Sequence, residues 1–255
     1  MADRLKLGVA GALGRMGRQV ETMASAREDM VVAARFDREG AVGEGLVSHA
    51  EALSTCDVII DFSVASAAAV LAREAAKAGR CRLVIGATGF TPEEEAAVLE
   101  AARSVAIVKS GNFSLGLNVL IGLVRQAAAA LPMADFDLEV FEAHHKRKID
   151  APSGTALMLG AAGAEGRGQD LAQVAVRVRD GVTGPRKPGS IGFSVVRGGG
   201  IVGEHSVVLA GEEEILTLSH SARDRALFAR GAVAAAAFIA AKPPGLYSMQ
   251  DVLGF

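Results

Sequence analysis

The feature that most restricts how this chain can fold is an alternation of short apolar runs with helical patterns over its first 110 residues. The apolar runs that predict strands lie at residues 5–10, 30–36, 57–62, 82–86 and 106–109. Helical patterns follow at 14–26 and 66–77. A third helix is expected after Thr91, because Pro92 and Glu94 complete a capping box with it. Repeated strand–helix units are typical of a parallel sheet with helices on both faces, so we predict the α/β class.

The second half of the chain has a different pattern, in which most predicted strands alternate apolar and polar residues. These strands lie at residues 136–143, 173–180, 191–198, 205–211 and 214–220. Helices are expected at about 115–130, 153–165 and 223–241, and the glycine run at 197–203 is expected to form a turn between two strands. Alternation with period two favours a sheet that is buried on one face. We therefore expect a central α+β domain with an open mixed sheet.

The composition argues against several classes of function. The net charge is −2 and both signs are interspersed, which gives no electrostatic footprint for nucleic acid or an anionic membrane. No apolar stretch is long enough to span a membrane, and the one that comes nearest, from residue 113 onward, is interrupted by Arg125. Cys56 and Cys81 cannot form a disulfide framework, and the N-terminal segment meets a glycine turn too early for a secretory signal. A cytoplasmic protein without nucleic-acid or membrane partners is expected.

Three glycines follow the first predicted strand with the spacing G-x-x-G-x-x-G, at Gly11, Gly14 and Gly17. The strict dinucleotide pattern G-x-G-x-x-G would need glycine at position 12, where this chain has Ala12. The turn nevertheless follows a strand and opens a helix, and Asp37 comes 20 residues after Gly17. Glycines in this context let the backbone approach a pyrophosphate at a helix N-terminus, and the acid accepts hydrogen bonds from a ribose. We predict a dinucleotide site; the alternative is a glycine-rich turn beside a solvated acid.

Further residues near this turn are candidates for the same site. Arg38, next to Asp37, is suited to pair with a 2′-phosphate. The loops at 86–90 and 110–114 follow strands of the same predicted sheet, and ligands of such sheets bind beyond the carboxyl ends of the strands. The glycines of both loops fit ordinary turns equally well.

The segment EAHHKRKIDAPSGTA (142–156) gathers two adjacent histidines and three cations at the end of a predicted strand. His144 and His145 are candidates for proton transfer, since the pKa of a histidine lies near neutral pH, and Lys148 adds a positive charge. Taken singly, a histidine at a strand end is more often structural and a KRK cluster is more often solvated. Together with an independent dinucleotide site, these residues favour an active site.

The same segment then opens a predicted helix with Ser153, Gly154 and Thr155. Ser153 and Thr155 are candidate caps, and Gly154 exposes backbone N–H groups to an incoming carboxylate. An anion site at this helix start is therefore expected beside the histidines.

Over nearly its whole length the sequence resembles the dihydrodipicolinate reductase family. The matching segments are GALGRMGRQ, GATGF, GNFSLGLN, EAHHKRKIDAPSGTA, IGFSVVRGGGIVGEHSV and AGEEEILTLSHSARDRALFARGA. The H-H-x-x-K-x-D-x-P-S-G-T run is highly specific, whereas the glycine loop alone is not. The resemblance implies an oxidoreductase that uses NADH or NADPH to reduce 4-hydroxy-tetrahydrodipicolinate, a small cyclic imine dicarboxylate, in lysine and diaminopimelate biosynthesis.

The resemblance also implies roles for individual residues. His144 and Lys148 match the family's proton-transfer residues and are expected to be catalytic. Substrate contacts are expected from His145, Ser153, Gly154 and Thr155. Cofactor contacts are expected from Gly11, Ala12, Leu13, Gly14, Arg15, Met16, Asp37, Arg38, Gly86, Ala87, Thr88, Ser110, Gly111, Asn112 and Phe113, and no metal site is expected. At Ala87 and at Ser110-Gly111 the chain departs from the residues usual in the family.

The domain organisation follows from the same resemblance. It implies a Rossmann-like dinucleotide-binding domain of residues 1–114, completed by residues 222–255. Residues 115–221 are expected to bind the substrate and to build a homotetramer. The exposed face of an open sheet needs a partner, which independently favours an oligomer.

Two other functions stay open at this point. One is another small-acid NAD(P)-dependent dehydrogenase on the same architecture, and the other is a non-catalytic nucleotide sensor. The first would need a different polar constellation in the second domain, so the HHxxKxDxPSGT run argues against it.

Overall fold

The computed structural model describes residues 4–38, 40–41 and 45–255 of the chain. The chain divides into two compact units, one of Met1–Leu115 with Ala226–Phe255 and the other of Gly116–Arg225. Within the described ranges, no helix has both the length and the apolar character needed to cross a bilayer.

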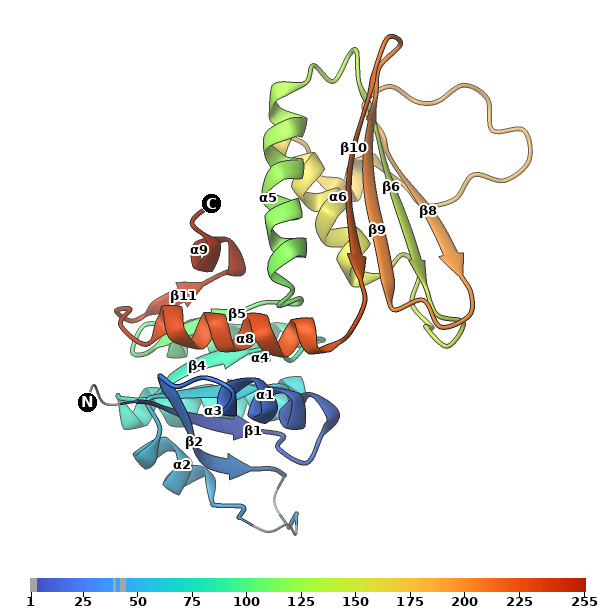
Figure 1. The fold of residues 1–255 in the computed structure, drawn as a ribbon. Coiled ribbons are helices and arrows are strands. Elements are labelled where there is room, and N and C mark those ends of the chain that lie inside the picture. The colour runs from blue at the N-terminus through green and yellow to red at the C-terminus, as the bar shows by residue number, and fades with distance from the viewer. Residues whose placement is uncertain (1–3, 39, 42–44) are drawn as a thin grey trace. The chain divides into compact units, whose positions relative to one another are not determined.

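The first unit is built on a six-stranded sheet (Figure 1). Its strands are β1 (Leu5–Ala10), β2 (Met30–Phe36), β3 (Val58–Asp61), β4 (Arg82–Ile85), β5 (Ala106–Lys109) and β11 (Gly245–Tyr247). They follow the spatial order β11-β5-β4-β3-β1-β2, and all neighbouring pairs are parallel. The predicted parallel sheet is thus confirmed. Strand β2 lies on one side of β1 and β3 lies on the other. The loops that follow β1 and β3 therefore lead away from each other at the carboxyl edge of the sheet, and such sheets bind ligands between loops of this kind.

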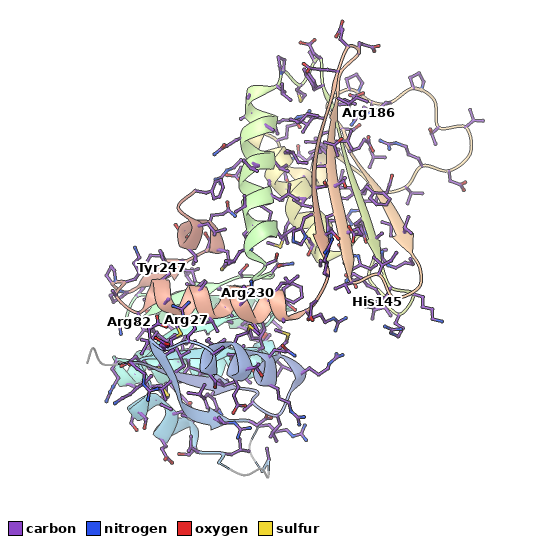
Figure 2. The ribbon with its side chains drawn as sticks, viewed as in Figure 1. Arg27, Arg82, His145, Arg186, Arg230 and Tyr247 are labelled. Atoms are coloured by element: carbon purple, nitrogen blue, oxygen red, sulfur yellow. The ribbon has the colours of Figure 1, made fainter. Side chains whose placement is uncertain are left out.

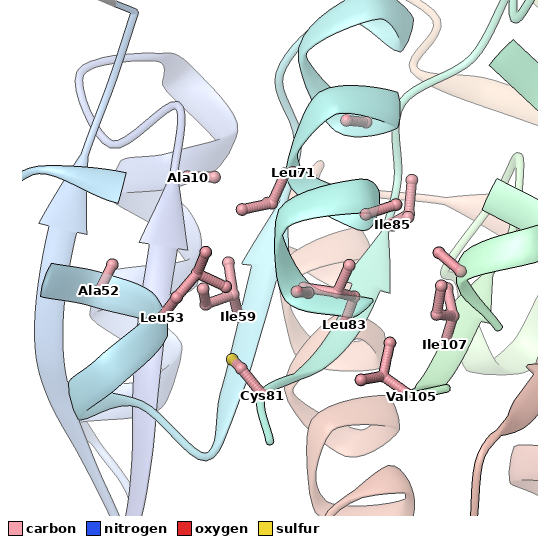
Figure 3. Packing of buried hydrophobic residues seen from close by; sticks show 14 of the residues in the cluster. Ala10, Ala52, Leu53, Ile59, Leu71, Cys81, Leu83, Ile85, Val105 and Ile107 are labelled. Atoms are coloured by element: carbon pink, nitrogen blue, oxygen red, sulfur yellow. The ribbon is translucent and has the colours of Figure 1, made fainter. Parts of the chain in front are cut away.

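Helices cover both faces of this sheet, because its central strands direct apolar side chains to both sides. One face packs α2 (His49–Thr55), α3 (Ala65–Ala78) and α4 (Pro92–Ala101), and the other packs α1 (Arg15–Ser25), α8 (Ala226–Ile239) and α9 (Met249–Leu253). Figure 3 shows the first of these two cores, where Ile59, Leu83 and Ile107 meet Leu71 of α3. The next residue along β3, Ile60, is buried in the other core, as strand alternation requires. The predicted capping box of α4 is confirmed, with hydrogen bonds exchanged between Thr91 and Glu94.

The second unit is built on a five-stranded mixed sheet. Its strands are β6 (Asp137–His144), β7 (Ala175–Val176), β8 (Ile191–Arg197), β9 (Gly203–Ala210) and β10 (Ile215–Ala222), in the order β10-β9-β6-β8-β7. The β6–β8 and β8–β7 pairs are parallel, whereas the β10–β9 and β9–β6 pairs are antiparallel. Helices α5 (Leu115–Ala130) and α6 (Gly154–Gly166) lie on one side of this sheet (Figure 1). The expected α/β fold with a second, mixed sheet is therefore confirmed.

The strand predicted at 173–180 is largely wrong. Residues 171–174 form the short helix α7, the strand β7 is only two residues long, and the chain then leaves the sheet as a long loop up to β8 (Figure 1). Val174 at the start of this segment still packs against the core, but Val178 and Val182 are mostly or fully exposed. Its arginines instead reach back to the edge of β6, where Arg179 and Arg186 both pair with Glu139.

Candidate active site

A pocket of the first unit lies at the carboxyl edge of its sheet, where the loops after β1, β2 and β3 meet. It has a volume of about 750 Å³. Five of the predicted cofactor residues line it: Gly11, Leu13, Gly14, Asp37 and Arg38. The structure therefore brings the glycine turn and the predicted acid together around one cavity.

The backbone of the glycine turn fits a ligand that carries a pyrophosphate. Gly11 has a φ of +69°, a conformation that side chains with a Cβ rarely adopt. A Cβ on Gly17 would lie 2.3 Å from the carbonyl oxygen of Gly11, so only glycine allows this contact between helix and turn. Gly14 is the N-cap of α1 and supplies no side-chain hydrogen bond, which leaves the first N–H groups of the helix to an anion.

Asp37 is held in place beside this turn. Its carboxylate accepts a hydrogen bond from the Leu13 amide at 2.9 Å and another from the Arg38 amide at 2.9 Å. The acid at the end of β2 is therefore fixed at the rim of the cavity, in the position from which a ribose is bound in sheets of this type.

The other predicted residues of this loop have less direct access to the cavity. Ala12 is fully buried, and its amide donates to the carbonyl of Phe36. Met16 packs against the core, and Arg15 is the exposed first residue of α1.

The predicted loops after β4 and β5 approach the cavity through Phe62. A Cβ on Gly86 would lie 2.3 Å from the Phe62 ring, and the buried ring of Phe113 meets Phe62 edge to face at 5.6 Å. Ala87 is buried and Thr88 is exposed. Ser110 is bonded to the backbone of Asn112, and Gly111 between them is exposed. The residues of these two loops do not line the pocket. They contact Phe62, which does line it.

The loop after β3 is the part of the pocket that the sequence reasoning missed. Phe62, Ser63 and Val64 line the cavity together with Ala67 and Val70 of α3. At its start, the carboxyl of Asp61 is buried and accepts a hydrogen bond from the Ser63 amide at 2.7 Å. Burial raises the pKa of Asp61, against the effect of that bond. The sequence did contain a signal for this loop, since it follows a predicted strand. The loops at 86–90 and 110–114 were selected for the same reason.

A second group of polar residues lies in the other unit, at the end of β6. His144 is the last residue of that strand, and its Nδ1 lies 2.6 Å from Oε2 of Glu142. Glu142 is fully buried, on the same face of the strand as His144. Arg197 at the end of β8 binds both oxygens of this carboxylate, at 2.7 and 2.8 Å. The ring of His144 is therefore fixed by a buried ion pair.

The carboxylate of Glu142 stays ionised in this setting. Burial alone would raise its pKa, but hydrogen bonds from Arg197, His144 and the Ser153 amide outweigh burial and hold the pKa below its ordinary value. The Ser153 amide lies 2.9 Å from Oε1 of Glu142, so the same carboxylate also contacts the start of α6.

The predicted anion site lies at the start of α6, where the structure shows a side-chain cap followed by an open glycine. The side chain of Ser153 is buried and caps the helix by accepting from the Ala156 amide. Gly154 is exposed, and no atom lies within 4 Å of the position where a Cβ would stand. Thr155 follows it in the first turn and is half-buried. A carboxylate is thus able to approach this helix end without a side chain in its way.

Lys148 and His205 complete the polar surroundings of His144. Lys148 pairs with Asp150 at 2.8 Å, and its charge contributes to the environment of the buried His205. Desolvation and the neighbouring charge of His144 lower the pKa of His205 to about 4, so this ring is neutral near pH 7. It lies edge to face against His144 at 5.0 Å and contacts the Ser153 hydroxyl.

His145 has different surroundings from His144. It follows β6, and its Nε2 lies 3.3 Å from the guanidinium of Arg225. Desolvation and the charges of Arg147 and Arg225 lower its pKa. In Figure 2, His145 and Arg186 lie at opposite ends of the same sheet, which separates the histidine cluster from the ion pairs of the 177–190 loop.

Sequence reasoning missed Glu142, Arg197 and His205. A signal for Glu142 existed, since it occupies an inward-facing position of β6 between the buried residues Val140 and His144. A glutamate at such a position needs a cation, but the pattern does not tell which of the chain's arginines supplies it.

Both halves of the chain are similar to one known family. Residues 5–113 match the family model described as dihydrodipicolinate reductase, N-terminus, and residues 116–253 match the one described as dihydrodipicolinate reductase, C-terminus. The 4-hydroxy-tetrahydrodipicolinate reductase of Caulobacter vibrioides is 64% identical over 255 residues, which cover 100% of this chain and 99% of that protein. The protein of the same name from Rhizobium rhizogenes is 52% identical, with coverage of 99% and 97%.

Solved structures also resemble the chain. A dipicolinate-bound dihydrodipicolinate reductase from Paenisporosarcina sp. has a TM-score of 0.77 and 23% identity, with 97% of this chain and 98% of that one covered. An engineered D-amino acid dehydrogenase bound to NADP⁺ has a TM-score of 0.58 and 15% identity, with coverage of 96% and 93%. At these identities the likeness concerns the fold.

The buried ion pair predicts a large loss of stability in Arg197→Gln. The variant leaves the carboxylate of Glu142 buried without its cation, which costs about 3–5 kcal/mol of unfolding free energy near neutral pH. Because the folded-state pKa of Glu142 is lowered, the stability it contributes is present above the unfolded value of about 4.3 and is lost as pH falls through the folded value. The deficit of the variant should therefore shrink in acid.

Urea unfolding at a series of pH values measures this deficit. The matched control is Arg179→Gln, because Arg179 binds Glu139 of the same strand in a partly exposed pair. Such a pair contributes about 1 kcal/mol or less. Equal losses in the two variants would contradict the assignment of the buried pair.

Proposed function

The chain belongs to the dihydrodipicolinate reductase family, and we propose that it reduces 4-hydroxy-tetrahydrodipicolinate to tetrahydrodipicolinate with a reduced nicotinamide dinucleotide. This step belongs to lysine and diaminopimelate biosynthesis. The observation that carries the proposal is the full-length identity of 64% to a curated reductase. The buried Glu142–His144 pair beside the start of α6 supplies chemistry that suits the reaction.

The dinucleotide would be held by the first unit. The first N–H groups of α1, the turn at Gly11 and the fixed carboxylate of Asp37 fit its pyrophosphate and a ribose. Arg38 is exposed beside Asp37, where a guanidinium would pair with a 2′-phosphate, so we propose that both NADH and NADPH are accepted. When bound, the cofactor supplies the hydride.

The substrate would be held by the second unit. Its carboxylates suit the N–H groups at Gly154 and Thr155 and the charge of Lys148. A conjugated imine that gains a hydride also gains electron density, and it must then take up a proton to give the product. His144 supplies that proton, and Lys148 stabilises the charge that develops before the transfer. His145 contributes a further contact to the substrate.

In this proposal, one unit binds the dinucleotide and the other binds the substrate. Residues 1–114 with 222–255 bind the dinucleotide, and residues 115–221 bind the substrate and form the contacts of a homotetramer. The helix-free face of the second sheet supports the oligomer, because Phe141, Val196 and Ile215 are exposed on it, at 37%, 43% and 67%. Apolar side chains that are exposed on one face favour association with a further copy.

A spectroscopic assay tests the proposed reaction directly. Oxidation of NADH or NADPH is followed after addition of the product of the preceding aldolase. Turnover that requires this substrate is expected. Turnover with a small amino or hydroxy acid instead would identify another dehydrogenase, and dinucleotide binding without turnover of either kind would identify a nucleotide sensor.

The cofactor assignment is tested by Arg38→Ala. Loss of one charge-assisted contact should weaken NADPH binding by about 1–3 kcal/mol and leave NADH binding nearly unchanged. Calorimetric titration with both dinucleotides measures the difference. If both affinities fell equally, Arg38 would not be the residue that contacts the 2′-phosphate.

The proton-transfer assignment is tested by His144→Ala and Lys148→Ala. Loss of His144 should lower kcat by roughly 10²–10⁴-fold while dinucleotide affinity stays intact. Loss of Lys148 should lower kcat and also raise KM, since it contacts the substrate before and during the reaction. If both variants fold, bind the dinucleotide and turn over at the wild-type rate, the active site lies elsewhere.

A further inference from the structure

We propose that Glu142 is the positioning residue of the proton transfer: it keeps the proton of the neutral His144 ring on Nδ1 and leaves Nε2 to exchange a proton with the substrate. This inference rests on the proposed function for its catalytic part. The assignment of the tautomer rests on the geometry around Glu142 alone.

The first step concerns the ionisation of Glu142. Its carboxylate is fully buried and accepts hydrogen bonds from both Nη atoms of Arg197 and from the Ser153 amide. These donors and the charge of Arg197 hold the pKa of Glu142 below its ordinary value. An ionised carboxylate only accepts hydrogen bonds, so the contact of 2.6 Å with His144 requires the imidazole Nδ1 to donate. The ring nitrogen that carries the proton is thereby fixed.

The second step concerns the opposite nitrogen of the ring. Over the described part of the chain, the structure records no hydrogen bond at Nε2 of His144. Gly203, the first residue of β9, lies beside it, and a Cβ on Gly203 would stand only 3.2 Å from Nε2. The absence of a side chain at position 203 therefore leaves Nε2 uncrowded. His205 is neutral near pH 7 and adds no positive charge against a protonated His144.

The third step concerns the substrate site. Oε2 of Glu142 contacts His144, and Oε1 contacts the Ser153 amide directly before the first residue of α6. Arg197, which binds both oxygens, also donates to the carbonyl of Asp150, the partner of Lys148. One buried carboxylate thus fixes the proton donor relative to the helix end that suits the substrate's carboxylate. A site that transfers a proton tolerates little misplacement, since small shifts cost large factors in rate.

The proton transfer needs only the His144 ring, the reduced substrate and water. The doubly protonated His144 ring breaks its Nε2–H bond, and the reduced substrate forms a new bond to that proton. The ring returns to the neutral form with its proton on Nδ1, and water restores the proton on Nε2. Glu142 stays ionised throughout, as the acid partner of a histidine does in comparable hydrogen-bonded pairs.

The wild-type protein tests the tautomer without any substrate. The full chain is labelled with ¹⁵N-histidine, and the resonances of His144 are assigned by their loss in His144→Gln. At a pH above the titration of the ring, the spectrum should report a proton on Nδ1 and none on Nε2. A neutral ring with its proton on Nε2 would overturn the proposal.

The variant Glu142→Gln tests the consequence for catalysis. Its amide is able to donate to Nδ1, which moves the proton of the neutral ring to Nε2. We expect this change in the spectrum and a fall in kcat of roughly 10²–10⁴-fold, the usual contribution of a positioned acid–base group, with dinucleotide affinity unchanged. The matched control is Glu139→Gln on the same strand, which also removes a charge bound by two arginines but should leave the His144 resonances unchanged. A wild-type kcat in folded Glu142→Gln would overturn the positioning role.

Two further variants cover the case in which Glu142→Gln does not fold. The double variant Glu142→Gln with Arg197→Gln removes the orphaned cation as well, and it should show the same shift of the proton to Nε2. Gly203→Ala leaves Glu142 intact and crowds Nε2, so it should lower kcat with the tautomer unchanged; an unaltered kcat would contradict the use of Nε2. A wild-type protein with its proton on Nδ1 but without turnover would overturn the proposed reaction and leave the tautomer assignment in place.

Discussion

The buried ion pair of Glu142 and Arg197 is the interaction on which the second unit's polar site depends. A carboxylate removed from water costs several kcal/mol unless a cation and further donors replace the solvent. Here the replacement comes from three segments, since Arg197 lies at the end of β8, His144 at the end of β6, and Ser153 before α6. Because the penalty for losing any one of these donors is large, the three segments are held in a single arrangement. Rigid placement of a proton donor and a helix end is what a reaction between small charged groups requires.

Each unit has one of the proposed anion sites at a helix start, and the two helices begin differently. In the first unit, α1 begins after Gly14, which supplies no side-chain cap. In the second, α6 begins after Ser153, whose hydroxyl caps the Ala156 amide, while Gly154 stays open. A bare helix end suits a pyrophosphate, which replaces all of the missing acceptors, whereas a capped end with one open residue suits a single carboxylate. The difference follows from the residue at each N-cap, which is glycine in α1 and serine in α6.

The sequence predicted the parallel sheet, the glycine turn and the histidine segment because each of these depends on neighbours along the chain. It failed where partners come from distant segments. The strand expected at 173–180 has the right alternation, yet Val178 finds no core and Arg179 reaches Glu139 instead. The cavity wall formed by Phe62 and Val64 was overlooked, although it follows a predicted strand. Glu142 could have been marked as a buried charge from its position in β6, but its partner Arg197 lies 55 residues away and no local pattern connects the two.

The discontinuity of the first unit has a consequence for the order in which the protein is made. Strand β11 pairs with β5, and α8 covers the face of the sheet that also packs α1, yet both come from the end of the chain. During synthesis the segments up to β5 leave the ribosome with Val84 and Val108 still uncovered on that face. The whole second unit must follow before α8 is available to cover them. Until α8 is made, the nascent chain therefore exposes one apolar face of the first sheet, and exposed apolar strands favour aggregation.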